Sequence, residues 1–158
     1  MHLTINTNQF ETYNVMISDK TKNNIMSNSD FYRIYYSNDD FTLNGVSICF
    51  KLTNISIEKY FNKIKCNFED NVFNRKEVES IKKLEKSILN KYNEINNIKI
   101  YRIEEQLSNH FLKLFDENKI KVGTYDSILF QLKISGIWSQ SQTNEYGLTF
   151  RFFVVNHN

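Results

Sequence analysis

The sequence contains no alanine and no proline, and it has only four arginines against sixteen lysines. Its most abundant residues include Asn, Ile, Lys, Phe and Tyr, which AT-rich codons encode, whereas the missing residues need GC-rich codons. This imbalance indicates an AT-rich genome, as in many viruses and some protists. The many lysines and asparagines are therefore weak grounds for inferring a binding surface.

Motifs for metal binding and catalysis are absent as well. There is no C-x-x-C pair, and the three histidines lie far apart in the chain, which does not fit the ligand spacing of a zinc site. The four glycines form no phosphate-binding loop, and "SGIWS" is not the G-x-S-x-G elbow of a hydrolase. Asp39 and Asp40 suit a turn, and Glu104 and Glu105 suit the start of a helix. We therefore expect no enzyme, no metal site and no cofactor.

Long hydrophobic segments are also missing. No apolar run approaches eighteen residues, so we expect no membrane partner. The first fifteen residues lack a basic segment followed by an apolar one, so we expect no signal peptide. These absences favour an intracellular protein, in the host cytoplasm or nucleus if it is viral. In that setting Cys49 and Cys66 are expected to be free, buried thiols.

The overall composition fits one folded domain spanning residues 1–158. The chain is 41% hydrophobic and 15% aromatic, so it can bury a substantial core. Its formal net charge is +2 and its pI about 8.4, below the pI above 9 that is usual for a strongly basic nucleic-acid binder. Binding to nucleic acid is therefore permitted, but it requires positive charge to be gathered on one face.

The apolar pattern predicts both strands and helices. Residues 31–37 and 41–52 are rich in aromatic and β-branched residues, which predicts strands, with a bulge or a tight turn at Asn44 and Gly45. A regular apolar stripe predicts a helix over residues 75–93. Residues 1–28 are polar and predict a mobile arm with one short strand near residues 13–17. The other predicted elements are a short helix capped by Ser56, strands at 64–68 and 98–103, an amphipathic helix within 104–119, and strands at 128–138 and 146–155.

This order of elements predicts an α+β fold, with a curved, mostly antiparallel β-sheet or a small barrel and one or two packed helices. The two closing strands have one purely apolar face, which we expect to lie in the core because side chains alternate along a strand. The residues of that face are Ile128, Phe130, Leu132, Ile134, Leu148, Phe150, Phe152 and Val154.

The opposite face of the same strands mixes cations with large apolar residues. Such a face can follow phosphates while an aromatic ring stacks on a base, or it can be an ordinary solvated surface. Gly136 indicates a bulge or a sharp bend, and Trp138 is then either a plug in the core or a platform at the mouth of a barrel. The residues of the mixed face are Gln131, Lys133, Ser135, Ile137, Thr149, Arg151, Phe153 and Val155.

A second group of cations and aromatic residues lies earlier in the chain. In "FYRIYYS", Arg33 and Tyr35 are expected to be exposed together. Lys51, Lys63 and Lys65 lie on the polar faces of their predicted strands. If these strands adjoin the closing hairpin, the cations merge into one groove; otherwise they are surface lysines that reflect the genome.

The stretch "FQLKISGIW" followed by "YGLTFRFFVV" resembles the closing hairpin of the OB-fold single-stranded DNA-binding proteins of phages and large DNA viruses. The resemblance rests on Gly136, Ile137, Trp138 and Gly147, within residues 128–155. It implies an OB-like barrel that binds single-stranded nucleic acid without reading its sequence and that serves DNA replication. The contacts expected under this resemblance are Trp138, Lys133, Arg151, Phe153, Arg33, Tyr35 and Lys51.

A viral structural or interaction module is the alternative from another functional class. It would form a homo-oligomer or pack its aromatic hairpin on another subunit. The small net charge favours this reading, and so does the apolar group formed by Ile137, Phe153 and Val155 on the mixed face.

Overall fold

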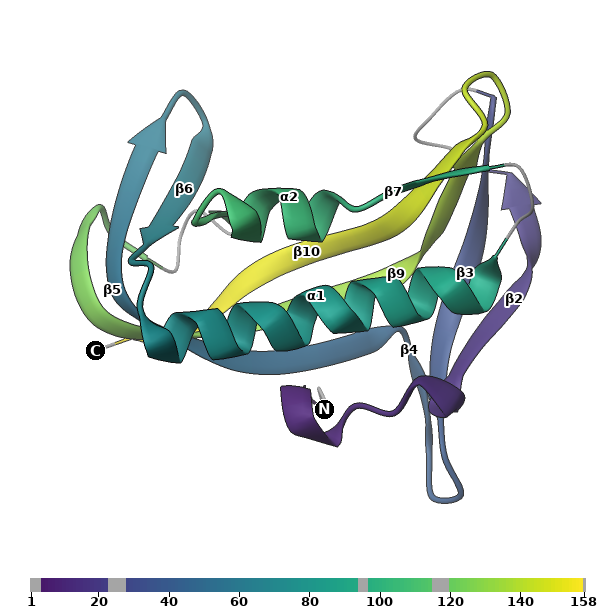
Figure 1. Ribbon diagram of the computed structural model, residues 1–158, viewed down its shortest axis with the longest axis horizontal. Helices are drawn as coiled ribbons and strands as arrows, with labels where there is room; N and C mark the ends of the chain where they lie inside the picture. The colour runs from purple at the N-terminus through teal and green to yellow at the C-terminus, as the bar shows by residue number, and fades with distance from the viewer. Residues whose placement is uncertain (1–3, 23–27, 94–96, 115–119, 158) are drawn as a thin grey trace.

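The computed structural model describes residues 4–22, 28–93, 97–114 and 120–157. Five strands close into a small barrel with extra strands and two helices, which confirms the predicted α+β class (Figure 1). Around the barrel the strands follow the order β5, β6, β8, β10, β9 and back to β5. All neighbours are antiparallel except β8 and β10, which run parallel. The strands span Val46–Tyr60 (β5), Lys63–Phe68 (β6), Phe111–Leu114 (β8), Gly123–Gln140 (β9) and Glu145–His157 (β10).

Shorter strands extend this barrel into a curved sheet. Residues 123–134 of β9 pair with β5, and residues 136–140 pair with β3. Strand β2 lies along the other edge of β3, and β4 pairs with the end of β3 on the same edge as β9. Strand β1 joins β5 and strand β7 joins β10, both in parallel. Their bounds are Ile5–Asn6 (β1), Val15–Lys22 (β2), Ser29–Ser37 (β3), Thr42–Asn44 (β4) and Ile98–Ile100 (β7).

The N-terminal segment belongs to this sheet rather than forming an arm. Residues 4–22 contain β1, two short 3₁₀ helices and β2, and the predicted strand near residues 13–17 is the start of β2. Lys91 also donates a hydrogen bond from Nζ to the backbone oxygen of Thr12. Residues 1–3 and 23–27 lie outside the described residues.

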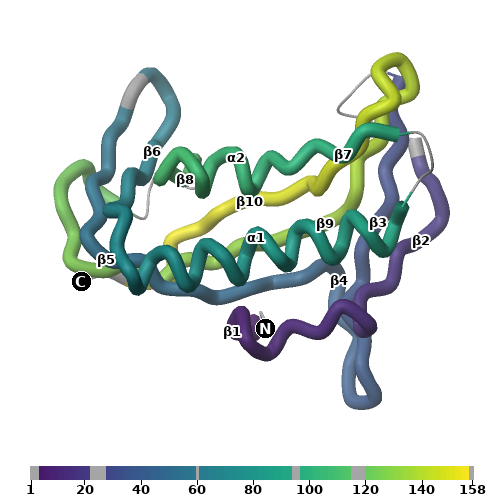
Figure 2. The backbone as a smooth tube through the Cα atoms, in the orientation of Figure 1, coloured from purple at the N-terminus to yellow at the C-terminus, as the bar shows by residue number. Residues whose placement is uncertain are grey.

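Two helices lie on the same side of the curved sheet (Figures 1 and 2). Helix α1 (Val72–Tyr92) confirms the predicted stripe, with Ile81, Ile88 and Leu89 fully buried. The Asn71 side chain caps its first turn, and Asn93 ends it in the left-handed conformation. Among the described residues, neither helix is long and apolar enough to cross a membrane.

The barrel core is built from the apolar face of β9 and β10, as predicted. The ring of Phe50 stacks on Phe130 at a centroid distance of 5.5 Å and meets the edge of Phe152 at 6.0 Å. Phe150 is half-buried and packs its ring at 5.6 Å from that of Phe152. Alternation along the strand therefore identified the inside of the barrel correctly.

The predicted helix within residues 104–119 is mostly wrong. Helix α2 spans Arg102–Ser108, so it begins inside the predicted strand 98–103. His110 then takes a positive φ of 59°, and the chain turns into β8. Leu112 and Leu114 point into the core, where β8 closes the barrel between β6 and β10. Pairing of β8 with β6 and β10 thus overrides the helix-like spacing of apolar residues in this segment. The rest of the predicted helix, residues 115–119, lies outside the described part of the chain.

The predicted helix after Ser56 is also wrong, because β5 continues through it to Tyr60. Ile55 and Ile57 alternate into the core, and Asn54 takes a φ of 52°, which bends the strand around the barrel. The predicted strand 41–52 is broken at Gly45, whose φ of 79° separates β4 from β5.

Both cysteines are free thiols, as expected. Cys66 is buried in the core, whereas Cys49 is only half-buried. Burial raises the pKa of both thiols above the ordinary value for cysteine, so neither is an activated nucleophile.

Candidate nucleic-acid interface

Four cationic side chains lie in one line across four adjacent strands of the barrel. In the sheet register, Lys65 pairs with Lys113 and Arg151 pairs with Lys133. Strands β8 and β10 pair in parallel one residue further on, which sets Lys113 beside Arg151. The residues before and after each cation in the chain are buried, apart from Phe150, which is half-buried. Because side chains alternate along a strand, all four cationic side chains lie on the outer face of the barrel. We call this line the cation row.

The cation row concentrates like charge at close range. Neighbouring strands lie about 4.8 Å apart, so the three steps of the row span about 14 Å. Two like charges about 5 Å apart repel by roughly 1 kcal/mol even in water, and like charges directly opposite one another destabilise a sheet. A bound polyanion would remove this repulsion, which is the physical reason to consider the row as a binding surface.

Aromatic rings flank the row at two points. The Nζ atom of Lys65 lies 4.7 Å from the ring centroid of Phe111, the first residue of β8. Phe153 follows Arg151 by two residues on the same face, and it is half-buried like Phe111. Both rings therefore keep part of their surface open beside a cation.

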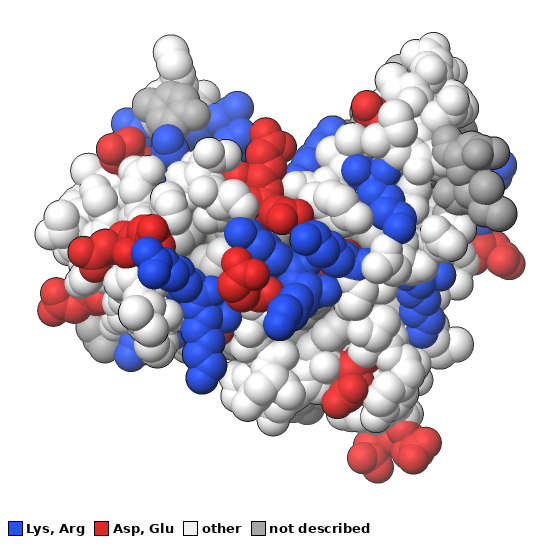
Figure 3. All heavy atoms as spheres, in the orientation of Figure 1, with Lys and Arg blue, Asp and Glu red and all other residues white. Residues whose placement is uncertain are grey.

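Among the described residues of the barrel strands, few acidic side chains lie on the outer face near the row. Glu58 pairs with Lys65 across β5 and β6. Ion pairs between side chains lie between β2 and β3, within and at the start of α1, and between α1 and α2. The face that carries α1 differs, because there lysines and arginines are interspersed with acidic residues (Figure 3).

The structure brings together three of the seven predicted contacts, Lys133, Arg151 and Phe153. Lys51 is exposed on the same outer face but pairs with a residue four positions before Lys133, about 13 Å along β9. The remaining three predicted contacts, Arg33, Tyr35 and Trp138, lie on β3 and β9, displaced from the row in the direction opposite to Lys51.

A bulge in β9 explains why the predicted face is wrong beyond Lys133. The register between β9 and β10 shifts so that Ser135 is an extra residue, and the alternation of side chains reverses after it. Ile137 therefore points into the core and is fully buried, not exposed as expected. The apolar group proposed for an interaction module loses this member, although Val155 remains 51% exposed and Phe153 half-buried.

Trp138 is also buried, so the expectation of an open stacking platform is wrong for this conformation. Its side chain is 2% exposed, yet it lies outside the hydrophobic core cluster, on the opposite side of the strand from Ile137. The guanidinium carbon of Arg102 lies 4.6 Å from its ring centroid. Among the described residues, the indole Nε1–H has no hydrogen-bond partner.

Two of the glycines that carry the resemblance have a direct structural role. A Cβ on Gly136 would lie 2.3 Å from Cζ of Phe31, and a Cβ on Gly147 would lie 3.0 Å from Cζ2 of Trp138. Both rings therefore approach the backbone closely where a glycine leaves room for them. Arg33 in turn lies 6.0 Å from the ring centroid of Phe31. Cations and rings thus continue along β3 and β9 beyond the row.

Sequence reasoning missed Lys113 and Phe111 because it placed both on a helix. The alternation in "FLKL" was the available signal, since it fits a strand with Phe111 and Lys113 on one face. Lys65 was placed on the polar face of its strand, but its neighbours in the barrel could not be predicted.

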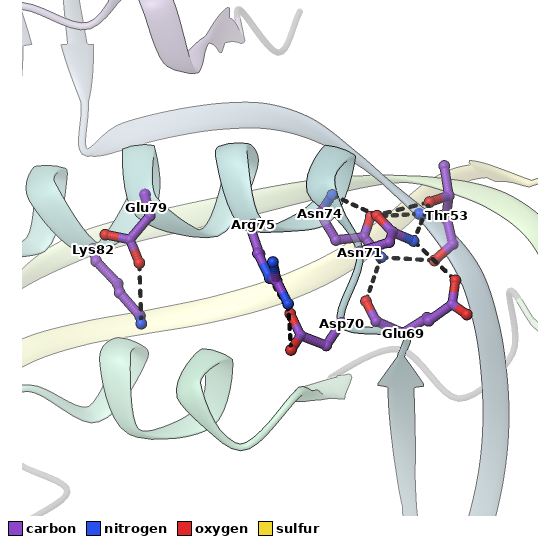
Figure 4. Close-up of polar contacts among 8 residues, drawn as sticks. All are labelled: Thr53, Glu69, Asp70, Asn71, Asn74, Arg75, Glu79 and Lys82. Carbon is purple, nitrogen blue, oxygen red and sulfur yellow. Dashed lines mark hydrogen bonds and ion pairs between the residues drawn. The ribbon is translucent and has the colours of Figure 1, made fainter.

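A hollow of about 260 Å³ beside the start of α1 is a weaker candidate. Its charged groups are paired with one another: Arg75 Nε lies 2.6 Å from Asp70, and Lys82 Nζ lies 3.5 Å from Glu79 (Figure 4). The buried amide of Asn74 exchanges hydrogen bonds with the backbone of Thr53. These contacts fasten α1 to β5 and leave little unpaired charge for a ligand.

Glu85 is a buried acidic residue of helix α1. Its carboxylate accepts hydrogen bonds of 2.9 Å from the backbone N–H groups of Ile103 and Glu104, at the start of α2. Burial raises the pKa of this carboxyl to about 7, although the two hydrogen bonds oppose the shift. Glu85 thereby fixes the position of α2 and of its first residue, Arg102.

Comparisons with protein-family models, curated proteins and solved structures each found no match. Among the described residues, no group of three or more His, Cys, Asp or Glu side chains is arranged to hold a metal ion.

Proposed function

We propose that the protein binds single-stranded DNA, without sequence preference, on the outer face of the barrel around the cation row. The observation that carries this proposal is the alignment of Lys65, Lys113, Arg151 and Lys133 on four adjacent strands. Three of the four are lysines, whose ammonium groups act as point charges toward phosphates, and contacts to phosphates carry no sequence information.

The flanking rings favour a single strand over a duplex. Phe111 and Phe153 can stack only on bases that are not already stacked within a double helix, and such stacking contributes roughly 1–3 kcal/mol per base. The row also follows the curved wall of a closed barrel, which a flexible strand can follow more closely than a stiff duplex.

The proposal predicts how strongly the affinity for DNA depends on salt concentration. If each cation of the row neutralises one phosphate, log K falls with log salt concentration at a slope of about −2.8, from about −0.7 for each of four phosphates. The test is fluorescence anisotropy with labelled oligo-dT and a matched duplex at two or more salt concentrations. We expect binding of oligo-dT that weakens at this slope, and weaker binding of the duplex.

Variants of the row identify the surface. Replacing Lys113 and Arg151 together by Gln is expected to weaken binding and reduce the slope to about −1.4, because two phosphate contacts are lost. Lys76→Gln together with Lys83→Gln is the matched control, since it also removes two charges and both lysines are exposed on α1. Absence of oligo-dT binding at low salt would refute the proposed function. An equal loss in the Lys76 and Lys83 double variant would show that net charge, not the row, is responsible.

A further inference from the structure

We propose that Arg102 is a displaceable cover over Trp138, and that the uncovered indole is a stacking site for one base of the bound strand. This inference rests on the proposed function, and it assigns to that function a second contact point outside the cation row. It concerns two side chains that meet on the outer surface, one from α2 and one from β9.

A flexible side chain, Arg102, lies over the indole ring. Trp138 is 2% exposed, but Arg102, whose guanidinium lies 4.6 Å from the indole centroid, is itself exposed. The indole atoms Cζ2 and Cε2 lie near Gly147, where a Cβ would approach them to 3.0 and 3.1 Å. A guanidinium and a nucleobase are both planar and stack on an indole in the same way, so one can replace the other.

The indole also has an unused hydrogen-bond donor. Its Nε1–H is buried and has no acceptor among the described residues. Buried donors are rarely left unpaired in folded proteins, and an unpaired one points to a missing ligand or solvent molecule. Nucleic acid supplies acceptors at base edges, sugars and phosphates. Replacement of Arg102 by a nucleotide would therefore give this donor a partner.

The site is continuous with the cation row. Along β10, Gly147 lies four residues before Arg151, so Trp138 and the row are about 13 Å apart. Phe31 pairs with Trp138 across β3 and β9 and carries Arg33 above its ring, on the same outer face. A strand leaving the row along β10 reaches Trp138, and the displaced Arg102 can then pair with a phosphate.

Trp138 is the only tryptophan, so its fluorescence reports on this site directly. Without DNA, acrylamide is expected to quench the wild-type emission weakly and the Arg102→Ala emission at least twice as strongly, because the cover is gone. Arg75→Ala is the matched control, since Arg75 is an exposed arginine that pairs with Asp70 and is expected to leave quenching unchanged. Equal quenching in the wild type and Arg102→Ala would overturn the role of Arg102 as a cover.

Binding experiments then test the stacking. Oligo-dT is expected to quench Trp138 emission in parallel with its anisotropy signal, whereas an abasic oligomer of the same length should bind the row without changing the emission. Anisotropy that reports binding of oligo-dT with no change in emission would overturn the stacking site and leave the proposed function standing. No anisotropy change with any oligomer would refute both proposals. These readouts use wild-type protein and do not depend on a Trp138 variant folding.

Discussion

Raising the pH from 5 to 8 is expected to destabilise the protein through Glu85. Burial raises the pKa of this carboxyl to about 7 in the folded state, against an ordinary value of 4.5. The folded state therefore binds a proton more tightly than the unfolded state, and the free energy of unfolding falls as pH rises between these two values. Above about pH 7 both states are ionised and the free energy becomes constant with respect to this group.

The size of the effect follows from the two pKa values. The linkage relation gives a loss of about 2.5 kcal/mol between pH 5 and pH 8 for this one group. In a chain of 158 residues this corresponds to a fall in Tm of roughly 5–10 °C. The loss reflects the cost of burying the charged carboxylate, which the two hydrogen bonds from the start of α2 only partly offset.

Urea and thermal unfolding, followed by far-UV circular dichroism at pH 5, 6, 7 and 8, measure this effect. Glu85→Gln cannot ionise, so its stability should vary less with pH by about the calculated amount, and Glu79→Gln, on the exposed side of α1, should behave like the wild type. Other titrating groups are common to all three proteins and cancel in the comparison. The same pH slope in Glu85→Gln and the wild type would refute the reasoning.

Two further substitutions test the packing. Gly136→Ala should destabilise the protein by about 2–3 kcal/mol in urea unfolding, because its Cβ would lie 2.5 Å from the backbone oxygen of Tyr32 and closer still to the ring of Phe31; a loss below about 0.5 kcal/mol would show that the ring moves away freely. Asn74→Ala should cost about 2–4 kcal/mol, since it leaves three partly buried hydrogen bonds to the backbone of Thr53 and Glu69 unmade. Unchanged unfolding of the Asn74 variant would mean that water replaces the amide.

Elements with an uninterrupted pattern could be predicted from the sequence. Helix α1 and the strands of the closing hairpin have regular apolar spacing over many residues, and the structure confirms them. Strand β8 could not be predicted in this way, because four residues carry almost no periodic signal and its partners come from distant parts of the chain. Lys113 lies on this strand, so the sequence could not predict that Lys113 joins the other cations of the row.

The alternation of faces could be predicted only as far as the bulge. Gly136 signalled an irregularity, but the sequence does not show whether a bulge adds one residue or merely bends the strand. In the structure Ser135 is the extra residue of a bulge, so Ile137 points to the face expected for Trp138, and Trp138 to the face expected for Ile137. The contact between Arg102 and Trp138 could not be predicted either, because Arg102 comes from a helix whose start lay in a predicted strand.

The junction between β8 and β10 is the seam at which the barrel closes. Strand β8 has four residues, and its parallel pairing with β10 is registered at Phe152 and Leu114. The cation row crosses this seam, with Lys113 on one side and Arg151 on the other. A strand of DNA bound to the row would therefore contact both β8 and β10 and stabilise their pairing. Binding of DNA would then slow amide hydrogen exchange in β8, so the exchange rate of β8 would report the fraction of protein that has DNA bound.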